Sequence, residues 1–438
     1  MSSATSSPSA PSSAEGSFRW VICLLLFLAT TVNYIDRQIL ALLKPMLDLQ
    51  LGWTNEQFGY VNAAFQGAYG LGLLGFGAWV DRRGTKIGFA VAIAAWSAAA
   101  MGHALVYTVG GFVVARIALG LGEGGNFPSS IKAIAEWFPR RERAFATSLF
   151  NSGANVGAII APAIVPFVAL HWGWRAAFVG AGIAGFVWLV LWLVYYDSPE
   201  HSRRVSEGEL RLIRSDPVSD DDTEKSPGWR VVLRHREAWA FITAKFITDP
   251  VWWFFLIWLP DFFKQSRGLA LSESWEYLVS IYVVVTVLSI FGGWITGYLA
   301  RRGWTVTRAR KTGMLIFALL VIPILFVTHV GDWPAVLLIG LAGAAHQAWS
   351  ANLFTTVSDI FPKRAVATLT GLGGLAGATG GMIFPWLTGM MLDHFKAAGN
   401  VTHGYAVLFS ICAFAYVVSF AINHALAPRF EPISLNVP

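Results

Sequence analysis

The chain has 438 residues, of which 55% are hydrophobic and only 13% are charged, and its formal net charge is +6. Because a soluble protein carries about a quarter charged residues, this composition excludes an ordinary soluble enzyme. Apolar windows of roughly 18 or more residues with few charges are typical of transmembrane helices. The sequence therefore predicts an all-α integral membrane protein that lies in the lipid bilayer.

The first stretch of the chain, residues 1–17, is rich in Ser, Ala and Pro and predicts a disordered tail. Twelve apolar spans follow, each long enough to cross a bilayer. In chain order they cover residues 18–43, 56–79, 86–107, 110–133, 144–169, 175–196, 238–263, 275–300, 311–330, 333–357, 366–392 and 403–426. Cys23 and Cys412 fall inside the first and last spans, so we expect neither a disulfide nor a metal site.

A polar stretch over residues 197–237 separates the sixth span from the seventh and predicts a linker. It divides the chain into a first half, residues 18–196, and a second half, residues 238–426, followed by a tail over residues 427–438. The halves also repeat, since "FPRRERAFATSL" follows the fourth span and "FPKRAVATLTGL" follows the tenth. This pattern predicts two pseudo-symmetric six-helix halves that are able to rock against each other.

Lysine and arginine are distributed unevenly between the two sides of the predicted bilayer. Twenty-four of the 32 fall in the termini and in the loops on the N-terminal side, and five fall in the opposite loops. Because cytoplasmic loops carry the excess of Lys and Arg, both termini and the linker are predicted to be cytoplasmic. The positive net charge thus follows from topology, and we expect no binding to nucleic acid.

Three cations lie inside the spans, namely Arg37, Arg116 and Lys245. A charge at the bilayer centre costs roughly 2.5–3.5 kcal/mol, so each needs a partner or a water-filled cavity. Asp36 precedes Arg37, but neighbours on a helix point about 100° apart and offset each other only partly. Arg116 and Glu123 are two turns apart on one helix face, separated by about 10.5 Å along the axis, so we expect both to face one cavity.

These charges favour a binding site for an anion. A guanidinium suits bidentate binding of a carboxylate, so Arg37 and Arg116 are candidate substrate ligands. Asp36 and Glu123 are candidate proton carriers, because the charge of a buried carboxyl depends on its surroundings. Glu123 is favoured as the principal carrier, since Asp36 has Arg37 beside it. The alternative is a static charge cluster that locks the first span to the fourth.

Other polar residues in the spans are weaker candidates, each with helix packing as the alternative. Lys245 and Asp249 are four residues apart and most simply pair with each other, and one of Trp252 and Trp253 is expected to face the pathway. A set rich in amides and aromatic rings could bind sugar hydroxyls or stack on a sugar ring. It comprises Gln66, Tyr69, Asn155, His346, Gln347, Trp349, Ser350 and Asn352.

The loop after the second span reads "GAWVDRRGTK" over residues 77–86. It resembles the loop signature of the major facilitator superfamily, and the twelve-span layout extends the resemblance over essentially the whole chain. The resemblance implies the major facilitator fold and transport by alternating access, with Asp81, Arg82 and Lys86 as gating charges. The second copy of the signature departs from it, with Ala300 in place of the aspartate.

More narrowly, "NYIDRQ", "GLGEGGNFP" and "DPVWWFFLIWLP" resemble the anion:cation symporters, and within them the bacterial hexuronate transporters. The resemblance implies a secondary active transporter of the cell (inner) membrane. It would carry a small organic anion, such as a hexuronate or another sugar acid, together with protons.

Two kinds of alternative stay open. One is a different carboxylate, such as a hexonate, glucarate or a dicarboxylate. The other is a different class of protein, a membrane sensor or a membrane enzyme. Because the sequence has no H-E-x-x-H motif and no Cys/His cluster, we expect neither an enzyme nor a cofactor. A monomer is expected as the oligomeric state.

Overall fold

The computed structural model describes residues 16–215 and 228–435, and every regular element in these ranges is a helix. The predicted all-α fold is therefore confirmed. The predicted disordered tail over residues 1–17 lies almost wholly outside the described residues. The middle of the predicted linker, residues 216–227, also lies outside them, as do residues 436–438.

The helices follow the predicted spans in order. The first half contains α1 (Phe18–Leu51), α2 (Asn55–Arg83), α3 (Thr85–Gly102), α4 (Val109–Glu123), α5 (Asn126–Trp137), α6 (Arg140–Trp172) and α7 (Trp174–Tyr195). Two short helices come next, α8 (Glu207–Ile213) and α9 (Trp229–Val232). The second half contains α10 (Arg236–Arg267), α11 (Leu271–Arg301), α12 (Val306–Val321), α13 (Asp332–Ile360), α14 (Lys363–Ala397) and α15 (Val401–Leu426).

The fourth predicted span, residues 110–133, is not one continuous helix. It divides into α4 and α5 at Gly124 and Gly125. At this point α2 comes so close that a Cβ on Gly124 would lie 2.5 Å from the carbonyl carbon of Gly72, a contact that only glycine avoids. The break follows directly after Glu123, so that this side chain stands at the end of a helix.

The ninth predicted span, residues 311–330, ends as a 3-10 helix over Ile322–His329 that begins around a proline without a backbone N–H. Within the described residues, nine helices are long and apolar enough to cross a membrane by length and composition. Of the other predicted crossings, α2 and α13 are 29 residues long each, and the α4–α5 pair is divided. The arrangement is consistent with twelve crossings.

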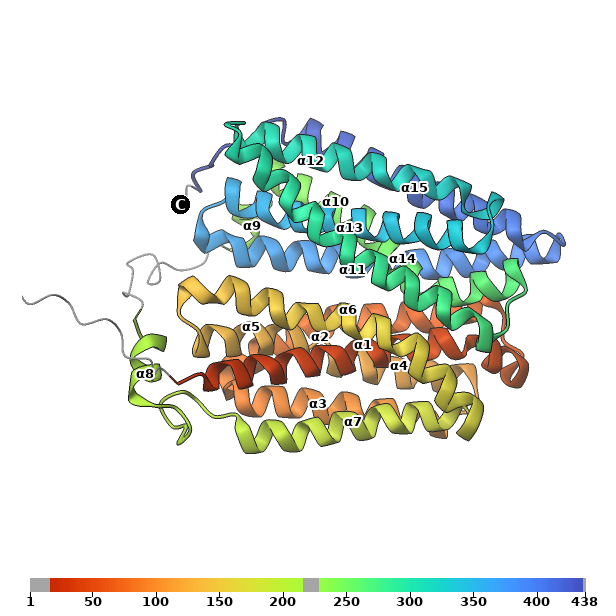
Figure 1. Cartoon of the computed structure of the whole chain (residues 1–438), viewed down its shortest axis with the longest axis horizontal. Helices are drawn as coiled ribbons and strands as arrows, with labels where there is room; N and C mark the ends of the chain where they lie inside the picture. Colours follow the sequence, from red (N-terminus) through yellow and green to blue (C-terminus); the bar gives the residue numbers. More distant parts are fainter. Residues whose placement is uncertain (1–15, 216–227, 436–438) are drawn as a thin grey trace, which may run out of the picture.

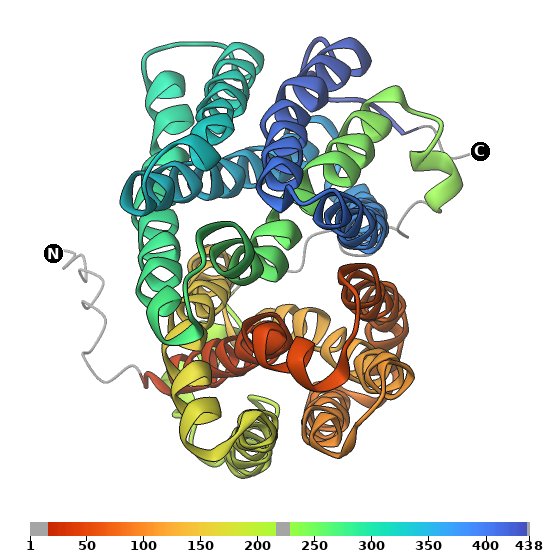
Figure 2. The same cartoon turned by 90° about the vertical axis from the view of Figure 1, so that its right-hand side faces the viewer.

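The helices form two bundles that lie side by side along the long axis of the molecule (Figure 1). The first bundle holds α1 to α7 and the second holds α10 to α15. The start of α1 and the end of α15 lie, with α8 and α9, at one end of the molecule, which we call the terminal end; the opposite end is the distal end. Figure 2 looks at the distal end and shows both bundles along their helices.

The bundles meet chiefly through three helix pairs: α2 with α14, α6 with α11, and α1 with α10. The first contact is close, since a Cβ on Gly59 of α2 would collide with the carbonyl oxygen of Pro385 in α14. Helix packing inside a membrane depends on such small residues, because lipid supplies no hydrophobic drive between helices.

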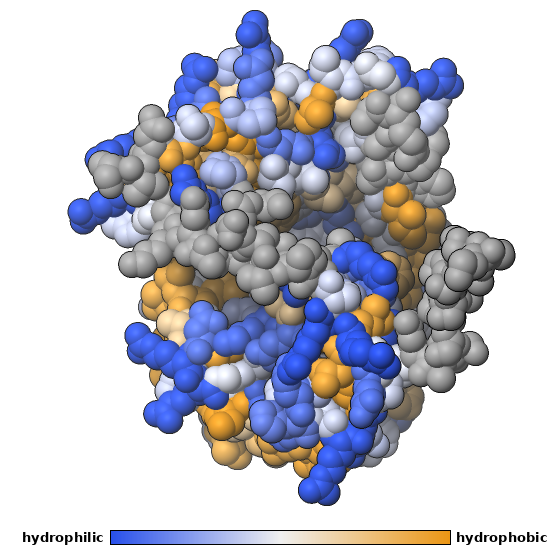
Figure 3. Space-filling view, turned by 90° about the vertical axis from the view of Figure 1, so that its left-hand side faces the viewer, coloured by the Kyte–Doolittle hydropathy of each residue, from blue (hydrophilic) through white to orange (hydrophobic). Residues whose placement is uncertain are grey.

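The terminal end carries many hydrophilic residues, and its surface is recessed between the two bundles (Figure 3). The helix α8 is fastened to this end by Glu209, whose buried carboxylate accepts hydrogen bonds from the backbone N–H groups of Phe18 and Arg19, at 3.2 and 2.9 Å. The acidic side chain thus caps the start of α1, where the first backbone donors lack helical partners.

Candidate functional site

A buried ion pair joins α1 to α4 inside the first bundle. The Nε of Arg37 lies 2.7 Å from Oε2 of Glu123, and only 8% of Arg37 and 0% of Glu123 are exposed. Two predicted candidates from different spans therefore meet directly. Burying an ion pair this deeply costs free energy unless its remaining donors and acceptors also form hydrogen bonds. The second carboxylate oxygen of Glu123, Oε1, has no hydrogen-bond partner among the described residues.

Asp36 does not pair with its neighbour in sequence. It is 1% exposed, and neither of its carboxylate oxygens accepts a hydrogen bond from a described protein group. Adjacent helical residues point about 100° apart, and the guanidinium of Arg37 turns toward Glu123 instead.

Arg116 completes the cluster. It is 1% exposed and lies within electrostatic range of both Asp36 and Glu123. Its Nε and one terminal nitrogen donate no hydrogen bond to a described protein group. The four charged residues predicted from spans one and four thus gather in one buried place. They hold two positive and two potentially negative charges and retain unused donors.

Aromatic rings enclose the guanidinium of Arg37. The ring of Tyr69, a predicted candidate on α2, has its centroid 4.3 Å from the guanidinium carbon. The rings of Tyr34 and Trp253 lie at 5.0 and 5.4 Å. Sequence reasoning missed Tyr34, although it stands three residues before Arg37 and hence on the same helix face. Trp253 brings α10 of the second bundle to the site.

Among the candidates predicted on α13, Gln347 and His346 have contacts that reach beyond their own helix. Gln347 crosses between the bundles, since its Nε2 donates to Oδ1 of Asn155 on α6 at 2.9 Å. The ring of His346 stacks on Trp252 with 5.5 Å between centroids, and its Nδ1 lies 2.6 Å from the Tyr416 hydroxyl. Gln347 therefore faces the first bundle, whereas both contacts of His346 are made within the second bundle.

Three other candidates of α13 have different surroundings. Trp349 is fully buried against Tyr416 within the second bundle. Asn352 donates to the carbonyl oxygen of Ala348 in its own helix, and Ser350 is partly buried. Gln66 of α2 is 1% exposed, and its Oε1 has no hydrogen-bond partner among the described residues.

Lys245 and Asp249 form the predicted i,i+4 ion pair on α10. The Nζ of Lys245 lies 2.7 Å from Oδ2 of Asp249, and the side chains are 8% and 18% exposed. The second bundle therefore holds a cation that is neutralised within its own helix.

The predicted gating charges bridge elements of one bundle at the terminal end. Asp81 pairs with Lys132 of α5 at 3.1 Å, and Lys86 pairs with Asp197 just after α7 at 3.2 Å. Partial burial opposes ionisation of Asp197, yet the hydrogen bond from Lys86 helps to lower the pKa of this carboxyl. Arg82 is exposed.

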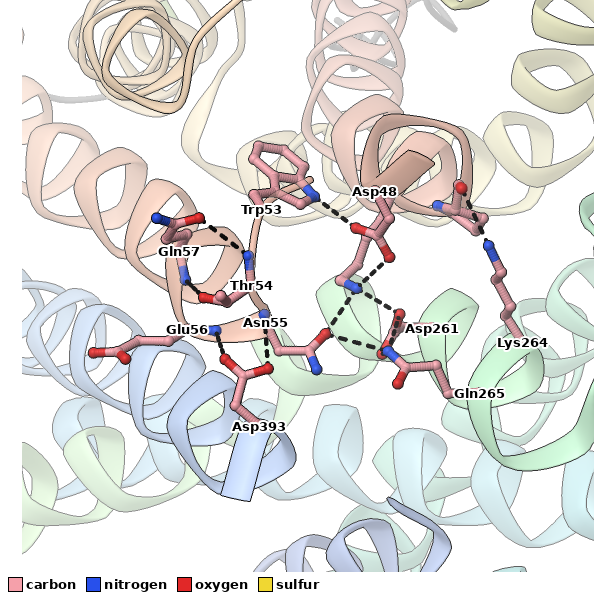
Figure 4. A network of polar contacts seen from close by, with 12 residues as sticks. Asp48, Trp53, Thr54, Asn55, Glu56, Gln57, Asp261, Lys264, Gln265 and Asp393 are labelled. Carbon is pink, nitrogen blue, oxygen red and sulfur yellow. Dashed lines mark hydrogen bonds and ion pairs between the residues drawn. The ribbon is translucent and has the colours of Figure 1, made fainter. Parts of the chain in front are cut away.

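A second polar cluster, which sequence reasoning missed, joins the two bundles at the distal end (Figure 4). The buried Nζ of Lys44 lies 2.9 Å from Asp48, 2.8 Å from Asn55 and 2.8 Å from Asp261 of α10. We call these four residues the distal cluster. The first predicted span ends at residue 43 and so counts Lys44 among the cations of the opposite loops, whereas α1 continues to Leu51; the i,i+4 spacing of Lys44 to Asp48 was a signal for a pair.

The distal cluster is reinforced by α14 and α15. The carboxylate of Asp393 accepts hydrogen bonds from the backbone N–H groups of Asn55 and Glu56, at 3.0 and 2.7 Å, and so caps the start of α2 from the other bundle. The hydroxyl of Tyr405 donates to Asp261 at 2.6 Å. Both bundles are thus held together at this end by charged hydrogen bonds.

Comparison with known proteins identifies one family. The model of the Major Facilitator Superfamily matches residues 26–385. The hexuronate transporter of Escherichia coli (strain K12) is 30% identical over 399 residues, with 90% of each chain covered. A probable galactarate/D-glucarate transporter of Bacillus subtilis (strain 168) is 28% identical, with 94% of this chain and 93% of that protein covered.

Among solved structures, a D-xylose-proton symporter resembles the chain with a TM-score of 0.73 at 18% identity. The similarity covers 95% of this chain and 99% of that one. At 18% sequence identity this similarity shows a shared fold and nothing further.

Proposed function

The chain belongs to the Major Facilitator Superfamily, and from that premise we propose that it carries a sugar acid, with a hexuronate as the first candidate, together with protons. It is a membrane-spanning transporter and not an enzyme. Relationship to a hexuronate transporter over 90% of both chains supports a sugar acid as the substrate.

The observation that carries this proposal is the buried cluster of Arg37, Arg116, Asp36 and Glu123. A sugar acid offers a carboxylate at one end and hydroxyl groups along its length. The two guanidinium groups supply donors in the fork geometry that a carboxylate accepts. The rings around Arg37 offer apolar faces for the sugar, and the amide of Gln347 is assigned to its hydroxyls.

The charge of this cluster supports the proposed coupling to protons. With both carboxylates ionised, the two arginines are balanced and Arg37 is occupied by Glu123. A proton on Glu123 removes its charge and releases the donors of Arg37 for the substrate carboxylate. Proton and anion together leave the cluster neutral, whereas either one alone leaves a net charge that is costly to bury. Asp36 is proposed to balance Arg116 throughout.

Alternating access requires that the two bundles separate at one end and then at the other. The proposed orientation places both termini in the cytoplasm, so the distal end faces outward. Opening toward the outside then requires Lys44 to leave Asp261 and Asp393 to leave the start of α2. Asp81, Arg82 and Lys86 are proposed to control the terminal end by holding its helix ends together during closure.

Uptake by the purified protein in proteoliposomes tests this function. Labelled D-galacturonate and D-glucuronate are offered with and without an inward proton gradient, and protein-free liposomes serve as the control. We expect uptake of at least one hexuronate and faster accumulation with the gradient. If the folded, reconstituted protein transports no sugar acid, the proposal is contradicted. If accumulation is the same with and without the proton gradient, proton coupling is contradicted.

A further inference from the structure

The ion pair of Lys245 and Asp249 lies next to the proposed binding site. Trp253, whose ring contacts the Arg37 guanidinium, follows Asp249 by one helical turn, about 6 Å along α10. Asp249 is also within electrostatic range of Tyr34, which lies under the same guanidinium. The pair therefore stands on the wall of the second bundle that faces the arginines of the first.

The pair is held firmly in place. The ammonium of Lys245 lies 4.6 Å from the ring centroid of Phe354 on α13. The carboxylate of Asp249 packs against Gly377 of α14, where a Cβ would collide with it. Three helices of the second bundle thus fix the two charges against each other, and the glycine leaves the space that the carboxylate fills.

The ion pair of Lys245 and Asp249 limits how many carboxylates a bound substrate can carry. In the first bundle, protonation of Glu123 releases one positive charge for one carboxylate. In the second bundle, Lys245 is the cation that could receive another carboxylate, but Asp249 already neutralises it. A second carboxylate at the far end of a substrate would meet a neutralised pair and the negative oxygens of Asp249, and burying it without a free cation is costly.

We propose that Asp249 makes this transporter selective for sugar acids with one carboxylate, by occupying the lysine that a second carboxylate would need. This inference rests on the proposed function and narrows its substrate class. It assigns hexuronates and hexonates to the site and excludes aldarates, the sugar diacids, although a relative of this chain is described as a probable galactarate/D-glucarate transporter.

Competition for labelled galacturonate binding at pH 6 tests the inference, with galactonate and galactarate as competitors. Both are open chains, and they differ in that galactarate has a carboxylate where galactonate has a primary hydroxyl. In the wild type we expect galactarate to compete about 10- to 100-fold more weakly than galactonate, the ratio that one unpaired or repelled carboxylate produces.

Asp249→Asn keeps the shape of the side chain and frees the charge of Lys245, so it should reduce that ratio by about tenfold or more. The double variant Lys245→Gln/Asp249→Asn removes both charges and should restore the preference for galactonate. Equal competition by the two acids in the wild type would overturn the inference, and so would a ratio that Asp249→Asn leaves unchanged.

Equal competition in the wild type rejects the inference even if Asp249→Asn fails to fold. If the folded wild type binds none of the three acids, the proposed function itself fails and the inference falls with it. If it binds all three equally, a sugar acid remains the proposed substrate and only the selectivity of the Lys245–Asp249 pair is rejected.

Discussion

At the scale of single residues, the guanidinium of Arg37 is bonded to Glu123 and surrounded by aromatic rings. Arg37→Lys should weaken sugar acid binding roughly 10- to 100-fold, because an ammonium replaces neither the fork nor the planar stacking of a guanidinium. Equilibrium binding of galacturonate to the purified variant measures this loss.

Arg175 supplies a matched control for that substitution. Its guanidinium also lies over aromatic rings, 4.3 Å from Trp174 and 4.8 Å from Tyr107, but it belongs to the start of α7, outside the proposed site. Arg175→Lys should leave galacturonate binding within about twofold. Tight binding by Arg37→Lys, or equal loss in both variants, would remove Arg37 from the site.

Residue identity could be predicted from the sequence more readily than pairing. Arg37, Arg116, Asp36 and Glu123 stand out because charges are rare and costly in apolar spans. Which arginine meets which carboxylate depends on how α1 and α4 are rotated against each other, and sequence spacing within one helix does not contain that rotation. Tyr34 went unrecognised for a different reason, because it has no charge to distinguish it from the other aromatic residues of the spans.

At the scale of elements, the ends of α1 and α2 are bound to α10 and α14 by the distal cluster and by Asp393. Asp261→Asn should weaken this contact, because the buried Lys44 loses one of its two carboxylate partners. We expect the distal end to open more often, so that a cysteine introduced at Gln66 is labelled several-fold faster by a water-soluble thiol reagent.

The control is a distal ion pair within one bundle. Arg267 lies 3.7 Å from Asp332 at the distal end of the second bundle, so Asp332→Asn removes a charge there without parting the bundles and should not change labelling. Cys23 and Cys412 are fully buried and add little background. Unchanged labelling in Asp261→Asn would show that Lys44 and Asp261 do not hold the distal end closed.

The ion pairs at the terminal end are expected to affect the rate of transport more than substrate binding. Asp81→Asn breaks the link from the end of α2 to Lys132 of α5, and we expect slower transport with a KM changed less than about threefold. An exposed pair of this kind contributes about 0–1 kcal/mol, so binding at the distant arginines should be spared. Initial rates of galacturonate uptake measure both constants; a rise in KM equal to the fall in rate would argue against a gating role.

At the scale of the whole molecule, the two helical halves could be predicted from twelve apolar spans, a central linker and a repeated loop. Hydropathy and repeats are properties of the sequence and do not depend on tertiary contacts. The closed distal end was not predictable. It depends on Lys44 meeting Asp261, 217 positions further along, and on Asp393 meeting the start of α2. Such contacts form only when both bundles are assembled.

The central claim is that Glu123 couples proton to anion by releasing Arg37. The most direct measurement compares gradient-driven accumulation of galacturonate with counterflow exchange in proteoliposomes containing wild type, Glu123→Gln or Asp36→Asn. Glu123→Gln mimics the protonated carboxyl, so it should lose accumulation driven by the proton gradient while retaining counterflow, which needs no net proton movement. Accumulation at the wild-type level in Glu123→Gln would contradict the claim. If Asp36→Asn also accumulates at the wild-type level, the charges of α1 and α4 serve only to hold the helices together.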